Sequence, residues 1–210
     1  MLSKYDVKII LKNRRNIILW LINLLLLVVY IFLVEDKDAY ARWYYMQVYN
    51  LVIPILVIMA QSNNYQTYMN SYVFMRFGKV EDIYKKIISC DLLVGLVFWF
   101  LNVFVCLMMI LVYGNEYPEL LLGQIFMMLV WPMFLMMFKH QLYLQLGHYR
   151  RANFISAIIW LVVYIVDTYY GYIFTSLSSS ILALAIAIMM IFICVRQVRN
   201  DKTLVRGQYE

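Results

Sequence analysis

Long apolar blocks alternate with short polar segments along the whole chain. Each block holds about 17–22 residues, which is enough to cross about 30 Å of hydrocarbon as an α-helix. The blocks cover residues 17–34, 44–60, 92–113, 120–138, 154–174 and 177–195. The pattern predicts an all-α polytopic membrane protein with six transmembrane helices, forming a single transmembrane domain over residues 1–210.

Basic residues are distributed unevenly between the two sides of this arrangement. Of the 18 lysines and arginines, only Lys37 and Arg42 lie in the segments that follow the first, third and fifth blocks. Short loops rich in Lys and Arg stay in the cytoplasm, so both termini are predicted to be cytoplasmic. The net charge of +6 then reflects topology and contact with anionic membrane lipid rather than binding to nucleic acid.

Composition narrows the class further. Hydrophobic residues make up 65% of the chain and charged residues 14%, which excludes an ordinary soluble domain. The first block is long enough to span and is not followed by a signal-peptidase site, so we expect it to remain as a helix. None of the three cysteines falls in a predicted outer segment, so no extracellular disulfide is expected.

Residues 2–15 precede the first block and are rich in lysine. Lys4, Lys8, Lys12 and Arg15 recur at helical spacing and would form one narrow basic stripe. This pattern predicts an interfacial amphipathic helix that lies along the membrane surface. The alternative is a basic tail that only enforces orientation.

The longest predicted cytoplasmic segment lies between the second and third blocks. Tyr65, Tyr68, Met69 and Tyr72 occur there at positions i, i+3, i+4 and i+7, among uncharged polar residues. This spacing predicts a helix with one aromatic face. Such a face suits docking into a groove on a protein partner, although it could instead pack against the bundle.

A second helix is predicted to follow that segment and to continue into the third block. Gly78 interrupts the pattern, and Glu81 then precedes Lys85 by four residues. Asp82 precedes Lys86 by the same spacing. Acid-first pairs at i,i+4 stabilise a helix, so they indicate where the new helix begins.

The segment 139–153 repeats the docking pattern more weakly. Leu142, Leu146 and Tyr149 would share one face of a helix, with Arg150 and Arg151 following. We interpret this face as a second, smaller cytoplasmic contact.

Motifs for catalysis or cofactor binding are lacking. There is no G-x-x-x-x-G-K-[ST] loop, so the chain cannot hydrolyse ATP by that route. His140 and His148 are the only histidines, and without a nearby acid they make a poor metal set. Asp91 and Asp167 lack the sequence context of intramembrane aspartyl proteases. We therefore predict a non-catalytic chain without a cofactor or metal of its own.

Two polar residues inside the blocks are candidates for a translocation path. Asp167 lies in the fifth block, where an ionisable group is costly and usually faces a partner or a water-filled cavity. Asn102 lies in the third block. The alternatives are that Asp167 is an interface residue and that Asn102 binds a neighbouring helix. Pro54 and Pro132 are expected to kink or break their helices.

These features together resemble the type-2 permease family of ATP-binding-cassette exporters. The local match is SYVFMRFGKVEDIYKKII, residues 71–88, which looks like the turn and basic helix that follow the coupling helix of these permeases. The resemblance implies that the segment 62–88 couples to an ATPase subunit. It assigns that contact to Tyr65, Tyr68, Met69, Tyr72, Arg76, Lys79 and Lys86. The chain has Asn64, Gln66 and Asn70 where many members have glutamates and a Gly-Thr pair.

The resemblance also implies a function. Compact members are similar to Gram-positive permeases that export antimicrobial peptides or confer immunity to them, so an amphipathic or hydrophobic substrate such as a peptide is expected. A partner ATPase would hold ATP and Mg, and a second copy or a paralogous permease would complete the pathway in the bacterial cytoplasmic membrane. The alternatives are a substrate-capture subunit of an energy-coupling importer, a membrane-embedded enzyme acting on lipid or peptide, or a membrane scaffold without transport.

Overall fold

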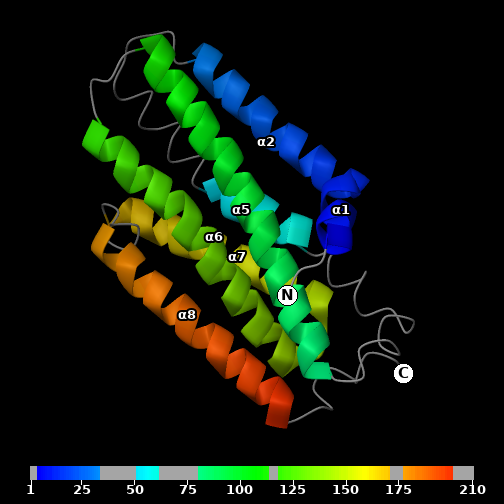
Figure 1. Ribbon diagram of the computed structural model, residues 1–210. Helices are drawn as coiled ribbons and strands as arrows, with labels where there is room; N and C mark the ends of the chain where they lie inside the picture. The colour runs from blue at the N-terminus through cyan, green and yellow to red at the C-terminus, as the bar shows by residue number, and fades with distance from the viewer. Residues whose placement is uncertain (1–3, 34–50, 62–79, 114–117, 171–176, 201–210) are drawn as a thin grey trace.

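The computed structural model describes residues 4–33, 51–61, 80–113, 118–170 and 177–200. Every element in these ranges is a helix, which confirms the predicted all-α class. The helices are α1 (Lys4–Lys12), α2 (Arg14–Leu33), an unlabelled helix Leu51–Gln61, α5 (Val80–Tyr113), α6 (Pro118–Leu146), α7 (Tyr149–Tyr169) and α8 (Leu177–Asn200) (Figure 1).

Three helices of the described chain are long and apolar enough to cross a membrane. They cover Val80–Phe104, Tyr149–Tyr169 and Ser178–Asn200. This finding supports a membrane protein. The count of six spans and the cytoplasmic position of the termini stay predictions.

Two helices extend well past the predicted blocks. α5 begins at Val80, where the acid-first pattern predicted a helix start, and the Nζ atom of Lys85 lies 2.7 Å from Oε1 of Glu81. α6 does not end at 138 but continues through Pro132 and on to Leu146. It stops before Gly147, whose φ of 69° suits glycine and ends the helical path.

A break at Asn13 separates α1 from α2, within the range predicted as one helix. The side-chain oxygen of Asn13 accepts a hydrogen bond from the backbone N–H of Arg15 at 3.0 Å, which caps the start of α2. The side-chain amide of Asn16 donates to the carbonyl of Ile10 at 3.1 Å. Ile10 is fully buried, so α1 is fixed against the bundle while Lys8 and Lys12 remain exposed.

Contacts between helices fix the directions in which α2 and α5 run. The rings of Trp20 and Phe98 lie 6.5 Å apart, and the side-chain amide of Asn23 donates to the side-chain oxygen of Asn102 at 3.0 Å. Residue numbers increase together in these two pairs. α2 and α5 are therefore parallel and start at the same end of the bundle, as Figure 1 shows.

The Leu51–Gln61 helix runs antiparallel to α7. The indole N–H of Trp160 donates to the carbonyl of Leu51 at 3.1 Å, and the hydroxyl of Tyr149 donates to the carbonyl of Gln61 at 3.4 Å. Gln61 therefore lies at the end of the bundle where α7 begins.

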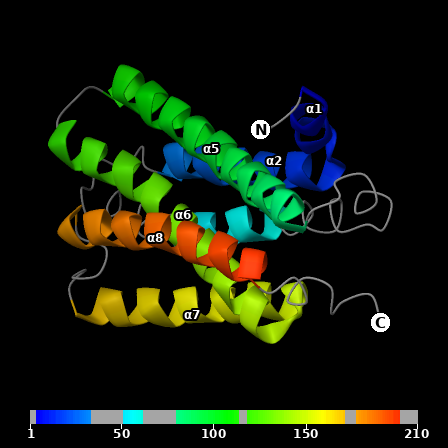
Figure 2. The ribbon, with the colours of Figure 1, turned by 60° about the horizontal axis from the view of Figure 1, so that its bottom comes forward.

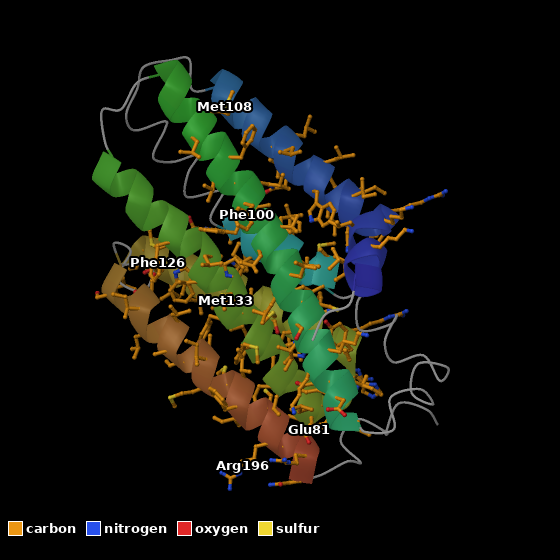
Figure 3. The ribbon with its side chains drawn as sticks, viewed as in Figure 1. Glu81, Phe100, Met108, Phe126, Met133 and Arg196 are labelled. Atoms are coloured by element: carbon orange, nitrogen blue, oxygen red, sulfur yellow. The ribbon has the colours of Figure 1, made fainter. Side chains whose placement is uncertain are left out.

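The end of α8 lies beside the start of α5. Arg199 is 3.5 Å from Glu81, and Figure 3 shows Glu81 and Arg196 at the same end of the bundle. The start of α2 is at this end as well. We call it the basal end.

Figure 2 shows α5 and α2 on one side of the bundle, α6 and α8 in the middle, and α7 on the other side. The bundle has an apolar core, and large apolar side chains also cover its exterior. Phe100, Phe154 and Phe192 are 63% exposed or more, whereas several polar side chains are fully buried. Because exposed patches of this kind mark contact with lipid or protein, the apolar exterior fits a hydrocarbon surrounding.

Candidate functional site

The strongest candidate site is a group of polar side chains buried near the basal end, which we call the charged cluster: Gln61, Asp91, Lys139 and His140. Oδ2 of Asp91 accepts hydrogen bonds from Nζ of Lys139 and from Nε2 of His140, both at 2.9 Å. The side chains of these three residues are 0% exposed. One carboxylate therefore serves two donors in surroundings without bulk water.

Gln61 completes the cluster by binding both sides of the ion pair. Its side-chain oxygen accepts a hydrogen bond from Nζ of Lys139 at 3.1 Å. Its side-chain nitrogen donates to the backbone carbonyl of Asp91 at 2.9 Å. The amide thus fixes the Leu51–Gln61 helix to both α5 and α6.

Tyrosine rings surround the cluster. The ring of His140 is edge-on to that of Tyr84, with centroids 5.6 Å apart, and Nζ of Lys139 lies 5.1 Å from the ring centroid of Tyr149. Tyr143 packs against Tyr149 at 5.7 Å. The ammonium on a ring face is a cation–π contact, which provides further compensation for burial of the charge.

The cluster joins three helices. Gln61 is the last residue of its helix, Asp91 lies in the fourth turn of α5, and Lys139 and His140 are neighbours in α6. Tyr149, which packs against the cluster, is the first residue of α7. The cluster therefore lies beside the helix end that precedes residue 62 and beside the start of α7.

The depth of the cluster follows from helix geometry. Lys139 is about 31 Å from the start of α6, and Asp91 is about 33 Å from the end of α5, at 1.5 Å per residue. These lengths match the thickness of hydrocarbon, about 30 Å. If the far helix ends were at one membrane boundary, the cluster would lie near the other.

Burial makes the charge balance of the cluster important. Desolvating an isolated charge is expensive, and a buried ion pair recovers this cost only with good geometry and further hydrogen bonds. The two ionised groups here have opposite charges, 2.9 Å apart, and Gln61 satisfies a further donor of Lys139. Breaking such a pair typically costs about 3–5 kcal/mol, so the cluster constrains how α5 and α6 pack.

Most of the predicted coupling residues fall outside the described ranges. These are Tyr65, Tyr68, Met69, Tyr72, Arg76 and Lys79. Lys86 is described and lies half-buried in α5. The docking role of this segment stays a prediction.

The residues of the predicted second contact do not share one helix. Leu142 and Leu146 belong to α6, where Leu142 is half-buried and Leu146 is 41% exposed. Tyr149 begins α7 beyond the break at Gly147 and is buried against the charged cluster. Of the three, Leu146 is the best placed for a partner to reach, and the contact itself stays a prediction.

The two candidate path residues are both buried. Asn102 accepts the hydrogen bond from Asn23, so it links α5 to α2, as the structural alternative for this residue supposed. Asp167 is 0% exposed in α7, close to the exposed Tyr169 and Tyr170. The burial of Asp167 places its side chain among protein atoms rather than lipid headgroups. Its part in a path stays a prediction.

Sequence reasoning missed the charged cluster. It ended the fourth block at residue 138 and expected no acid near the histidines, whereas Asp91 binds His140 directly. The boundary was wrong because α6 continues to Leu146. A signal was present, since Asp91 comes just before the third block and Lys139 just after the fourth. Antiparallel spans would bring the two opposite charges to the same depth.

The cluster can donate, accept and exchange protons. Among the described residues, no group of three or more His, Cys, Asp and Glu side chains could hold a metal ion. A ligand larger than a proton or a water molecule would require the helices to separate, because the charged side chains are fully buried. In comparisons with known proteins, no family model, no curated protein and no solved structure matches this chain.

Proposed function

We propose that this chain is the transmembrane permease subunit of an ATP-binding-cassette exporter. It moves an amphipathic or hydrophobic substrate, such as an antimicrobial peptide, across the bacterial cytoplasmic membrane. A separate ATPase subunit holds ATP and Mg and supplies the energy. The resemblance of residues 71–88 to the coupling region of type-2 permeases motivates this assignment, and the all-helical bundle with an apolar exterior supports it.

The observation that carries the proposal is that the two candidate contact segments begin at the same end of the bundle. Residues 62–79 lie between Gln61 and Val80, and the α6–α7 junction lies at Gly147. Hydrogen bonds connect Gln61 to Asp91 of α5 and to Tyr149 at the start of α7. An ATPase bound there reaches both segments at once, as a coupling mechanism requires.

The charge pattern gives the orientation in this proposal. The basal end carries exposed basic side chains from several helices, such as Lys8, Lys85, Arg151 and Arg199. Positive residues favour the cytoplasmic side, so the basal end faces the cytoplasm and both termini are inside. A second copy or a paralogous permease provides the other half of the pathway, which opens alternately to the two sides.

The decisive test is purification of the tagged chain from its native host in a mild detergent. Mass spectrometry then identifies co-purifying proteins, and ATP hydrolysis by the complex is measured. A stoichiometric nucleotide-binding subunit with ATPase activity is the expected result. A chain that purifies alone, without ATPase activity, contradicts the proposal.

A further inference from the structure

We propose that the charged cluster is a proton-binding site, and that Nδ1 of His140 is the atom that takes up the proton. This site goes beyond the permease assignment, because it requires neither an ATPase nor a transported substrate. Its ligand is a proton from water at the basal end, and the proton returns there on release.

The hydrogen bonds define the protonation state of the His140 ring. Nε2 lies 2.9 Å from Oδ2 of Asp91, and the same oxygen accepts from the Lys139 ammonium, so the carboxylate is ionised. Nε2 must then carry a hydrogen. In a neutral ring, the other nitrogen, Nδ1, has a free lone pair.

That lone pair is buried and unsatisfied. Nδ1 of His140 has no hydrogen-bond partner among the residues that the structure describes. A buried acceptor without a partner costs about 1–3 kcal/mol. The Asp91 carboxylate uses only Nε2 of the ring. Nδ1 is therefore left as the atom of the cluster where a proton can be added.

Ionisable groups face the ring from every helix around it. Asp91 and Tyr84 come from α5, Lys139 precedes the ring in α6, and Tyr149 comes from α7. Two further groups lie behind these, because Tyr143 packs against Tyr149 and Cys194 of α8 lies beside Tyr84. Burial lowers the proton affinity of His140 most, and Lys139 lowers it further, whereas the Asp91 carboxylate raises it.

Proton uptake changes the hydrogen bonding between helices. With the ring doubly protonated, the single negative charge of Asp91 faces two positive charges, those of Lys139 and His140. The cluster then has a net positive charge. The connection between α5 and α6 weakens, and water entering the cluster satisfies the new N–H. The basal end of the bundle thereby becomes responsive to the pH of the water on that side.

Histidine nitrogen NMR tests the site directly, because the chain has only two histidines. The protein is labelled with ¹⁵N-histidine, carries His148→Gln, and is held in lipid nanodiscs. We expect one set of signals, from His140. At about pH 8 Nε2 should carry a hydrogen and Nδ1 should not, and Nδ1 should gain a proton as the pH falls towards about 4. A proton on Nδ1 in the neutral ring, or no titration before the fold is lost, overturns the proposal.

Two further substitutions in the His148→Gln background give opposite expectations. Lys139→Met removes a repulsive charge and should raise the proton affinity of His140 at least tenfold, whereas Asp91→Asn should lower it at least tenfold. Lys85→Met removes an exposed lysine and should change it less than twofold. Equal shifts in one direction for all three variants contradict the assignment. Near-ultraviolet circular dichroism verifies folding, and the His148→Gln titration decides the question if a cluster variant does not fold.

Discussion

At the residue scale, the bundle is held by a few polar side chains in an apolar interior. Asn23 with Asn102, Asn16 with Ile10, and Trp160 with Leu51 each connect separate segments. Interhelical hydrogen bonds of this kind contribute about 0.6 kcal/mol on average in membrane proteins. The charged cluster is different, because removal of one partner leaves a buried charge.

A double-mutant cycle measures that difference. We expect Lys139→Met to lower the free energy of unfolding by about 3 kcal/mol, because Asp91 loses the ammonium that compensates it. The Asp91→Asn/Lys139→Met double variant should lose less than the sum of the single losses, because both charges are gone. Unfolding in mixed micelles by a denaturing detergent provides the measurement. Lys85→Met, at an exposed ion pair, should cost less than about 1 kcal/mol, and additive losses at the cluster would show that its charges are not coupled.

Asp167 is the second buried acid to test. Asp167→Asn keeps the size of the side chain and its capacity for hydrogen bonds but removes the charge. If this residue lines the pathway, transport or peptide resistance should decrease while expression stays at the wild-type level. Ser156→Ala, at another buried polar position of α7, is the matched control, because its hydroxyl donates to the carbonyl of Ala152 within the same helix. Unchanged transport in Asp167→Asn would assign the carboxylate a structural role.

At the scale of elements, local charge spacing and hydropathy differed in how well they predicted helix bounds. The start of α5 at Val80 followed from local charge spacing, and the Glu81–Lys85 pair is present. The end of α6 was predicted too early, because hydropathy falls at Lys139 while the helix continues to Leu146. Polarity marks where a helix leaves hydrocarbon, whereas backbone conformation decides where it ends.

The docking role of the predicted coupling helix can be tested by introducing negative charges on its aromatic face. A triple variant in which Asp replaces Tyr65, Tyr68 and Tyr72 should lose its association with an ATPase partner. Anchoring aromatic side chains contribute much of the binding energy in a groove. Membrane insertion should be intact. The control is Tyr169→Asp/Tyr170→Asp, which changes exposed tyrosines at the opposite end of α7. Co-purification in amounts equal to the wild type would refute the docking assignment.

At the scale of the whole molecule, the apolar blocks predicted the all-α class, because helices satisfy their own backbone hydrogen bonds inside a membrane. The charged cluster could not be derived in the same way. Its ion pair joins residues 48 positions apart in the sequence, and it depends on the rotation of α5 and α6 about their axes. Hydropathy gives no information about that rotation.

Orientation in the membrane is the remaining prediction at this scale. Lys8 and Tyr170 are exposed at opposite ends of the bundle. In a cysteine-free background, Tyr170→Cys should react with an impermeant maleimide on intact cells, whereas Lys8→Cys should react only after permeabilisation. This follows from the excess of basic residues at the basal end. The reverse pattern would place the termini outside, and labelling of both on intact cells would contradict an orientation set by the basic residues.

The length of α5 has a mechanical consequence. Asp91 divides this continuous helix into a basal arm of about 16 Å and a far arm of about 33 Å, a ratio of about one to two. A rigid rotation about the Asp91 anchor therefore moves the Tyr113 end about twice as far as the Val80 end, in the opposite direction. A displacement of about 2 Å at the Val80 end would correspond to about 4 Å at the Tyr113 end. In such a rotation α5 would act as a lever with the buried carboxylate as its pivot, and the Asn23–Asn102 hydrogen bond would carry the motion to α2.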